Sequence, residues 1–129
     1  MIQEDKNLLL PDLCARLPFG ICSNLLNHHL ASHKYIIHDI NIQNGWTTGL
    51  LDCAGRIQIY SAKVEDIKPY LRSMSSVTEE EEKELIDHFC NHRYAQYFDV
   101  CNKYHIDYRG LIEKGLAIEV TKDNNPYKD

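Results

Sequence analysis

The pattern of apolar and polar residues first predicts a helix near the N-terminus. Residues 8–17 place apolar side chains at positions 9, 10, 13, 14 and 17, the spacing of one helix face. Because proline has no backbone N–H, we expect Pro11 in the first helical turn. We therefore predict a short helix over about 10–17, ended by Pro18 and Gly20, with residues 1–7 frayed.

The next forty residues change to a period of two, which is typical of strands. We predict strands over about 21–26, 34–43, 46–51 and 56–60. The dipeptide Asn44-Gly45 favours a tight turn, and residues 52–55 supply another turn. These elements predict an antiparallel meander, curled or half-closed. Around Pro69 the sequence indicates a turn or a single helical turn.

The last third of the chain predicts helices. Thr78 followed by Glu81 is a capping box, and the acidic run 79–82 suits the positive end of a helix dipole. Apolar residues continue at helical spacing to Tyr104, either as one long helix or as two with a break at 91–93. Asp107 predicts another helix start, and Gly115 its left-handed end. A short strand over 116–120 would follow.

Together these elements predict a single α+β domain. It covers residues 1–120, with a sheet part at about 20–62, a helical part at about 78–116 and a flexible tail over 121–129. The sheet is expected to be a meander or half-barrel of three to five strands, packed with the N-terminal helix and two or three C-terminal helices. A length of 129 residues suits one domain.

Composition and charge narrow the function classes. The net charge of −5 disfavours direct binding to nucleic acid. No run approaches the ~20 apolar residues that cross a bilayer, and the N-terminus lacks a signal-peptide pattern, so we expect a cytoplasmic protein without membrane association. The five cysteines include no Cys-x-x-Cys pair, which indicates free thiols that act as small buried hydrophobes.

Two groups of histidines are candidates for metal binding. His88 and His92 lie four apart on a predicted helix, as zinc ligands do, and Glu84 could be a third ligand. Phe89 stands where a metalloprotease has its glutamate. A second cluster consists of His28, His29, His33 and His38. Because exposed histidines are the simpler interpretation of both groups, we assign no metal-binding, cofactor-binding or catalytic residue.

Other catalytic patterns are missing from the sequence. It contains no Gly-x-Ser-x-Gly elbow, no phosphate-binding glycine loop and no Gly-x-Gly-x-x-Gly. Cys90 and His88, two residues apart, would point to different helix faces. The remaining candidates for a functional role are aromatic residues: Trp46, Tyr94, Tyr97, Tyr104 and Tyr108. Such residues serve either in protein interfaces or in the core, and in so small a domain we favour the core.

Three segments carry a resemblance to a known family. They are Asp-Leu-Cys-Ala-Arg-Leu-Pro-Phe-Gly at 12–20, Ile-Lys-Pro-Tyr-Leu-Arg-Ser-Met-Ser-Ser at 67–76 and His-Ile-Asp-Tyr-Arg-Gly-Leu-Ile-Glu-Lys-Gly-Leu-Ala at 105–117. They resemble a family of small uncharacterised proteins from Bacteroides-type gut bacteria and their phages or prophages. The resemblance implies an intracellular accessory protein and assigns no activity, cofactor or site residue.

Two functional hypotheses from different classes follow. The first is a non-enzymatic interaction module that binds another protein, through the exposed sheet face or the tyrosine-rich helices. The alternative is a metal-dependent hydrolase that uses His88 and His92. The partner protein and the oligomeric state stay open.

Overall fold

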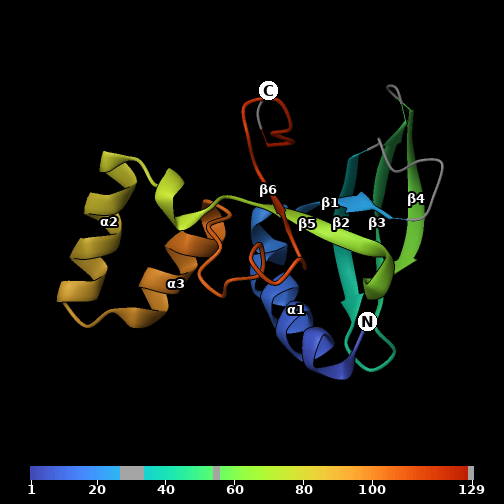
Figure 1. Ribbon diagram of the computed structural model, residues 1–129, viewed down its shortest axis with the longest axis horizontal. Helices are drawn as coiled ribbons and strands as arrows, with labels where there is room; N and C mark the ends of the chain where they lie inside the picture. The colour runs from blue at the N-terminus through green and yellow to red at the C-terminus, as the bar shows by residue number, and fades with distance from the viewer. Residues whose placement is uncertain (27–33, 54–55, 128–129) are drawn as a thin grey trace.

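The computed structural model describes residues 1–26, 34–53 and 56–127. It shows a sheet with one helix against it and a pair of helices standing to one side (Figure 1). The helices are α1 (Gln3–Arg16), α2 (Glu79–Cys90) and α3 (Tyr94–Lys103), with 3₁₀ turns at Leu17–Phe19, Val64–Asp66 and Met74–Ser76. The strands are β1 (Cys22–Leu25), β2 (Lys34–Asn41), β3 (Trp46–Cys53), β4 (Arg56–Lys63), β5 (Ile67–Leu71) and β6 (Ile118–Glu119).

The strands form one sheet in the order β4-β3-β2-β1-β5-β6. The first four strands are the predicted antiparallel meander. β5 then returns to pair with β1, and β6 adds a parallel strand beside β5. The α+β class is confirmed. The sheet is open and mixed over the described residues, with β4 and β6 as its edges, and its six strands exceed the predicted three to five.

α1 covers one face of the sheet. Its fully buried Leu9 and Leu13 belong to the same core cluster as Tyr35, Ile37 and Leu51 on the central strands. The opposite face is more open. On the edge strand β4, Ile57 and Ile59 are 67% and 78% exposed.

α1 is longer than predicted, because it begins at Gln3 and contains Pro11 in its interior. The expectation that residues 1–7 are frayed and that Pro11 opens the helix was therefore wrong. Proline removes the bond to the carbonyl of Asn7. Both Asn7 and Pro11 lie on the exposed side of the helix, where water can solvate that carbonyl, while the buried leucines hold the helix on the sheet.

Pro69 was also misleading. The segment predicted as a turn is the strand β5, in which Pro69 lies opposite Ser23 of β1. On the other side of β5, pairing with β6 starts only at Tyr70. The ladder thus has an open position beside Pro69 at which no N–H is required.

The segment after α3 contains no helix, contrary to the helix predicted from Asp107. Gly110 has a φ of 74°, which is not a helical conformation, so a helix cannot continue through this residue. Residues 111–116 make a single turn instead. It closes through the N–H of Gly115 on the Ile112 carbonyl (3.0 Å) and the N–H of Leu116 on the Leu111 carbonyl (2.9 Å). The predicted Schellman closure is therefore present without its helix.

The helix pair α2–α3 follows the sequence closely. The Thr78 N–H donates to Glu81 Oε1 (2.9 Å), and the Glu81 N–H donates to Thr78 Oγ1 (3.2 Å), which confirms the capping box. Of the two alternatives for residues 85–104, the break is correct. α2 ends at Cys90 and α3 begins at Tyr94.

Gly49 allows a test of the close approach between β3 and β2. A Cβ at this position would collide with the Ile36 carbonyl oxygen and lie 3.0 Å from the Ile37 Cα, both on the neighbouring backbone of β2. We expect Gly49→Ala to destabilise the fold by about 2 kcal/mol or more, since the strands must separate. Thermal and urea unfolding followed by circular dichroism measure this. Thr48→Ala on the same strand is the control, and equal losses in both variants would contradict the argument.

Candidate functional site

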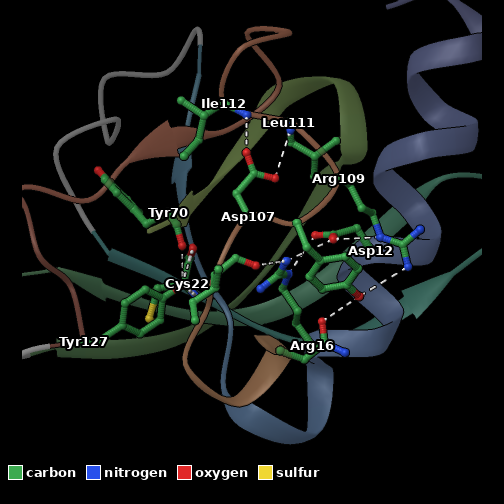
Figure 2. Close-up of polar contacts among 12 residues, drawn as sticks. Asp12, Arg16, Cys22, Tyr70, Asp107, Arg109, Leu111, Ile112 and Tyr127 are labelled. Atoms are coloured by element: carbon green, nitrogen blue, oxygen red, sulfur yellow. Dashed lines mark hydrogen bonds and ion pairs between the residues drawn. The ribbon is translucent and has the colours of Figure 1, made fainter. Parts of the chain in front are cut away.

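A buried ion pair lies on the inner side of α1. Asp12 and Arg16 are one helical turn apart, and both side chains are completely buried. Arg16 Nε lies 2.9 Å from Asp12 Oδ2, and Arg16 Nη2 lies 3.2 Å from Oδ1 (Figure 2). Nη2 also donates to the carbonyl of Ile106 at 2.7 Å. The pair therefore joins the first helix to a segment ninety residues later in the chain.

Two further side chains complete this polar centre. Arg109 Nε lies 3.1 Å from Asp12 Oδ1, so that one carboxylate serves two guanidinium groups. The Tyr108 ring faces both cations, at 5.3 Å from Arg16 Cζ and 5.2 Å from Arg109 Cζ. Its hydroxyl donates to Asn102 Oδ1 (2.9 Å). We call Asp12, Arg16, Tyr108 and Arg109 the polar centre.

Arg72, at the end of β5, ties the same region together. Its N–H donates to the His105 carbonyl (2.7 Å), and its carbonyl accepts from the Asp107 N–H (2.8 Å). Its side chain makes two 2.7 Å hydrogen bonds with Glu81. These bonds hold the pKa of Glu81 at about 2. The segments 12–20, 67–76 and 105–117 therefore meet in space. The charged side chains at their meeting point are either buried, as Asp12 and Arg16 are, or joined in an ion pair, as Arg72 is with Glu81.

Tyr127 changes the expectation of a flexible tail over 121–129. Its hydroxyl accepts from the Cys22 N–H (3.1 Å) and donates to the Tyr70 carbonyl (2.7 Å), as Figure 2 shows. Its ring stacks on His105 with centroids 3.8 Å apart. Burial raises the pKa of the phenol far above its ordinary value. The chain is thus pinned to the sheet up to Tyr127.

His105 is a residue that the sequence did not single out. It is only 8% exposed and has a φ of 58°, which is uncommon for a residue other than glycine. Burial, and then the positive charges of Arg16 and Arg72, lower the pKa of His105 to about 4. Its Nδ1 is buried with no hydrogen-bond partner among the described residues. Neither periodicity nor spacing in the sequence marks such a residue.

An apolar groove of about 540 Å³ lies along α2, with the segment 74–77 and Tyr97 of α3 as its other walls. Ile86 and Phe89 stand beside it with exposures of 51% and 55%. The Phe89 ring makes edge contacts with Tyr94 (5.6 Å) and Tyr97 (5.8 Å). We call this the hairpin groove; its lining residues are Met74, Ser75, Val77, Glu82, Leu85, Ile86, Phe89, Cys90 and Tyr97.

The two histidines of the metal hypothesis are not on one helix. His88 is in α2 and its Nδ1 accepts from Arg93 Nε (3.1 Å), whereas His92 lies beyond the helix end with a φ of 58°. His92 Nδ1 shares a hydrogen bond with the Tyr94 hydroxyl (2.9 Å). The expected third ligand, Glu84, accepts from the Tyr104 hydroxyl (2.9 Å).

The second histidine cluster is only partly described. His38 lies exposed on β2. His28, His29 and His33 fall outside the described residues. Across residues 1–26, 34–53 and 56–127, no three His, Cys, Asp or Glu side chains form a group that could hold a metal ion.

The cysteines and aromatic residues mostly fill space. The thiols of Cys14, Cys22, Cys90 and Cys101 are unpaired; Cys22 and Cys101 are buried, Cys14 is half-buried and Cys90 is exposed. Tyr97, Tyr104 and Tyr108 pack on a small second core of Leu85, Val100, Cys101 and Ile106, as predicted. Tyr94 and Trp46 instead stay 46% and 40% exposed.

Comparison with known proteins adds no relative: no protein-family model, curated protein or solved structure matches this chain. In the described part of the chain, every helix is too short or too polar to span a bilayer.

The polar centre predicts strong coupling between Asp12 and Arg16. Asp12→Asn leaves the buried guanidinium of Arg16 without its counter-ion, so we expect a loss of about 3–5 kcal/mol in the free energy of unfolding. The double variant Asp12→Leu with Arg16→Met removes both charges and should lose less than the single variant. Urea denaturation measures both. A double variant that is less stable than Asp12→Asn would contradict this interpretation.

His105 predicts a pH dependence of stability. The unfolded chain binds a proton at this residue near pH 6.5, while the folded chain resists protonation down to about pH 4. The folded state therefore loses stability as the pH falls from 6.5 to 4, by about 3 kcal/mol in total. His105→Asn, which tolerates the positive φ, should lack this component. Urea denaturation at several pH values gives the difference between the two proteins, and parallel curves would refute the prediction.

Proposed function

We propose that this chain is a non-enzymatic protein-interaction module that binds an amphipathic helix of a partner protein in the hairpin groove. The observation that carries the proposal is the exposure of Ile86 and Phe89 beside a groove of about 540 Å³. Burying such a side chain is worth ~1.5–3 kcal/mol. Large apolar groups left in contact with water around a concave surface are typical of binding sites.

The shape of the surface favours a helical occupant. α2 and α3 stand side by side, away from the sheet (Figure 1). The groove lies along one face of α2, and the segment 74–77 and Tyr97 of α3 supply its other walls. A long apolar groove of this kind suits the helix-in-groove mode of recognition. A partner helix with apolar residues at spacings of three and four would place them against Phe89, Ile86 and Leu85.

The charge of the rim indicates the polar face of the partner. Glu79, Glu80 and Glu82 are exposed in the first turn of α2, and Glu82 also lines the groove. They lie at the positive end of the helix dipole, a favourable position for negative side chains. A partner helix that carries lysine or arginine beside its apolar face complements this rim.

The groove is also held in place by the rest of the molecule. Ring contacts continue from Phe89 to Tyr97 (5.8 Å), from Tyr97 to Phe98 (5.3 Å) and from Phe98 to Tyr108 of the polar centre (5.1 Å). A binding surface that is already ordered loses less conformational entropy on association. This aromatic path supports a site that exists before the partner arrives.

The alternative function, a metal-dependent hydrolase, has less support. His88 and His92 each have a protein partner, and no third ligand lies beside them in the described part of the chain. A binding role also fits the accessory character that the resemblance to phage and prophage proteins implies. The groove therefore supports an interaction function better than the histidines support catalysis.

A designed peptide tests the proposal. We expect a helical peptide of about 18 residues, with leucines on one face and lysines beside them, to bind saturably in fluorescence anisotropy. Phe89→Ser should weaken this binding by about ten-fold or more, because the substitution removes an aromatic anchor. Phe89 is half exposed but contacts the Tyr94 and Tyr97 rings, so a small loss of stability is expected, and thermal unfolding should show that the variant stays folded under the conditions of the binding assay.

Matched controls distinguish binding in the groove from nonspecific binding of the peptide to other apolar surfaces. Ile59→Ser removes a large apolar side chain that is even more exposed, from β4, and should leave peptide binding unchanged. A peptide with glutamate in place of lysine should bind poorly. Absence of saturable binding, or equal losses in the Phe89 and Ile59 variants, would exclude the hairpin groove as the binding surface.

A further inference from the structure

A second cavity, of about 450 Å³, lies where the N-terminus of α2, the end of α3 and the C-terminal segment meet. It is separate from the hairpin groove, and each of its lining residues carries a polar or charged group. Its lining residues are Arg72, Thr78, Glu81, Lys103, Tyr104, His105, Asn125 and Tyr127.

The acceptor groups of this cavity are already occupied. Both carboxylate oxygens of Glu81 bind the Arg72 guanidinium, and Oε1 also accepts from the Thr78 N–H. The Thr78 hydroxyl accepts from the Glu81 N–H. Asn125 Oδ1 accepts from the Tyr127 N–H (3.0 Å). The oxygen atoms that could attract a cation are therefore engaged within the protein.

Two donor groups, the Lys103 ammonium and the Asn125 amide, have no carboxylate partner among the described residues. Lys103 forms no ion pair with the described carboxylates, and its ammonium lies over the Tyr104 ring at 5.0 Å from the centroid. The amide nitrogen of Asn125 carries two N–H donors, since its oxygen is the acceptor. A cavity that offers donors and one unpaired cation selects a ligand rich in acceptors.

His105 is a third donor among the lining residues. Its ring is nine-tenths buried and lines the cavity, held against Tyr127 on one face. Because an N–H at the buried, unpartnered Nδ1 would be an unsatisfied donor, the proton is assigned to Nε2. The neutral ring then presents an N–H through Nε2. The φ of 58° at His105 belongs to the Schellman closure of α3, in which the Ile106 N–H donates to the Cys101 carbonyl (2.9 Å).

The charges around the cavity agree with a negative ligand. Arg72 and Glu81 form an ion pair, and Glu84 accepts from the Tyr104 hydroxyl outside the lining of the cavity and keeps its negative charge. Arg16 approaches His105 from α1, where Asp12 is its counter-ion. Among the charged residues that line the cavity, Lys103 is the one without an ion pair in the described part of the chain.

We propose that this cavity binds a small oxyanion, a carboxylate or a phosphate group, through Lys103, Asn125 and His105. Each of the three groups would donate to an oxygen of the ligand, and the ammonium would supply the charge. Hydrogen bonds of this charge-assisted kind are stronger than neutral ones.

Titrations with sodium phosphate and with sodium acetate, followed by amide NMR at constant ionic strength, test the proposal. We expect the resonances of Lys103, His105 and Asn125 to move together and to saturate. Lys103→Met should weaken binding about ten-fold. Lys114→Met removes an exposed lysine from the 111–116 turn and should change nothing. Tighter binding of phosphate than of acetate identifies a phosphate site, and the reverse identifies a carboxylate site.

Two more measurements keep the test decisive. Acetamide has the shape of acetate without its charge and should produce no saturable shift. His105→Asn keeps the backbone conformation and should also weaken binding, with folding confirmed by its amide spectrum. The proposal is overturned if neither anion gives saturable shifts, if acetamide binds as acetate does, or if Lys103→Met binds as tightly as the wild type.

Discussion

The buried pair of Asp12 and Arg16 is the constraint on which the rest of the structure depends. Two charges taken out of water are stable only if nearly every donor and acceptor finds a partner. α1 supplies one partner for each, and the others come from residues 106–109, ninety positions along the chain. The C-terminal half must therefore return to the first helix. That return places β5 and β6 beside β1, although the sequence of the first four strands would have allowed the sheet to grow from β4.

The same centre fixes the position of the hairpin groove and the oxyanion cavity. Tyr108 faces the guanidinium groups on one side and contacts the Phe98 ring on another, which connects it with Tyr97 and the groove. Arg72 binds both the backbone around His105 and the carboxylate of Glu81, which connects β5 with the start of α2. Both proposed binding surfaces are thus built on one rigid base, which is the arrangement that precise recognition needs.

What the sequence predicted well depends on local interactions. The strands β1 to β4, the capping box at Thr78 and the left-handed Gly115 each follow from neighbours within a few residues. The errors occurred where distant contacts decide. Pro11 was expected in the first turn of a helix and Pro69 in a turn. Tertiary packing instead keeps Pro11 inside α1 and Pro69 inside β5. The ion pair and the buried His105 rest on contacts between remote segments, which periodicity does not encode.

The two exposed apolar regions of the molecule are not equivalent, and the difference decides which one is suited to binding. Ile57 and Ile59 stand on the edge strand β4, and they are more exposed than Met74, Ile86 and Phe89 of the groove. Arg56 and Lys63 lie at the two ends of that strand, and like charges on a sheet edge oppose its pairing with a second strand. The hairpin groove is concave, and its Phe89 is buttressed by neighbouring rings. Binding energy concentrates where an aromatic anchor can be enclosed, so the less exposed surface is the better binding site.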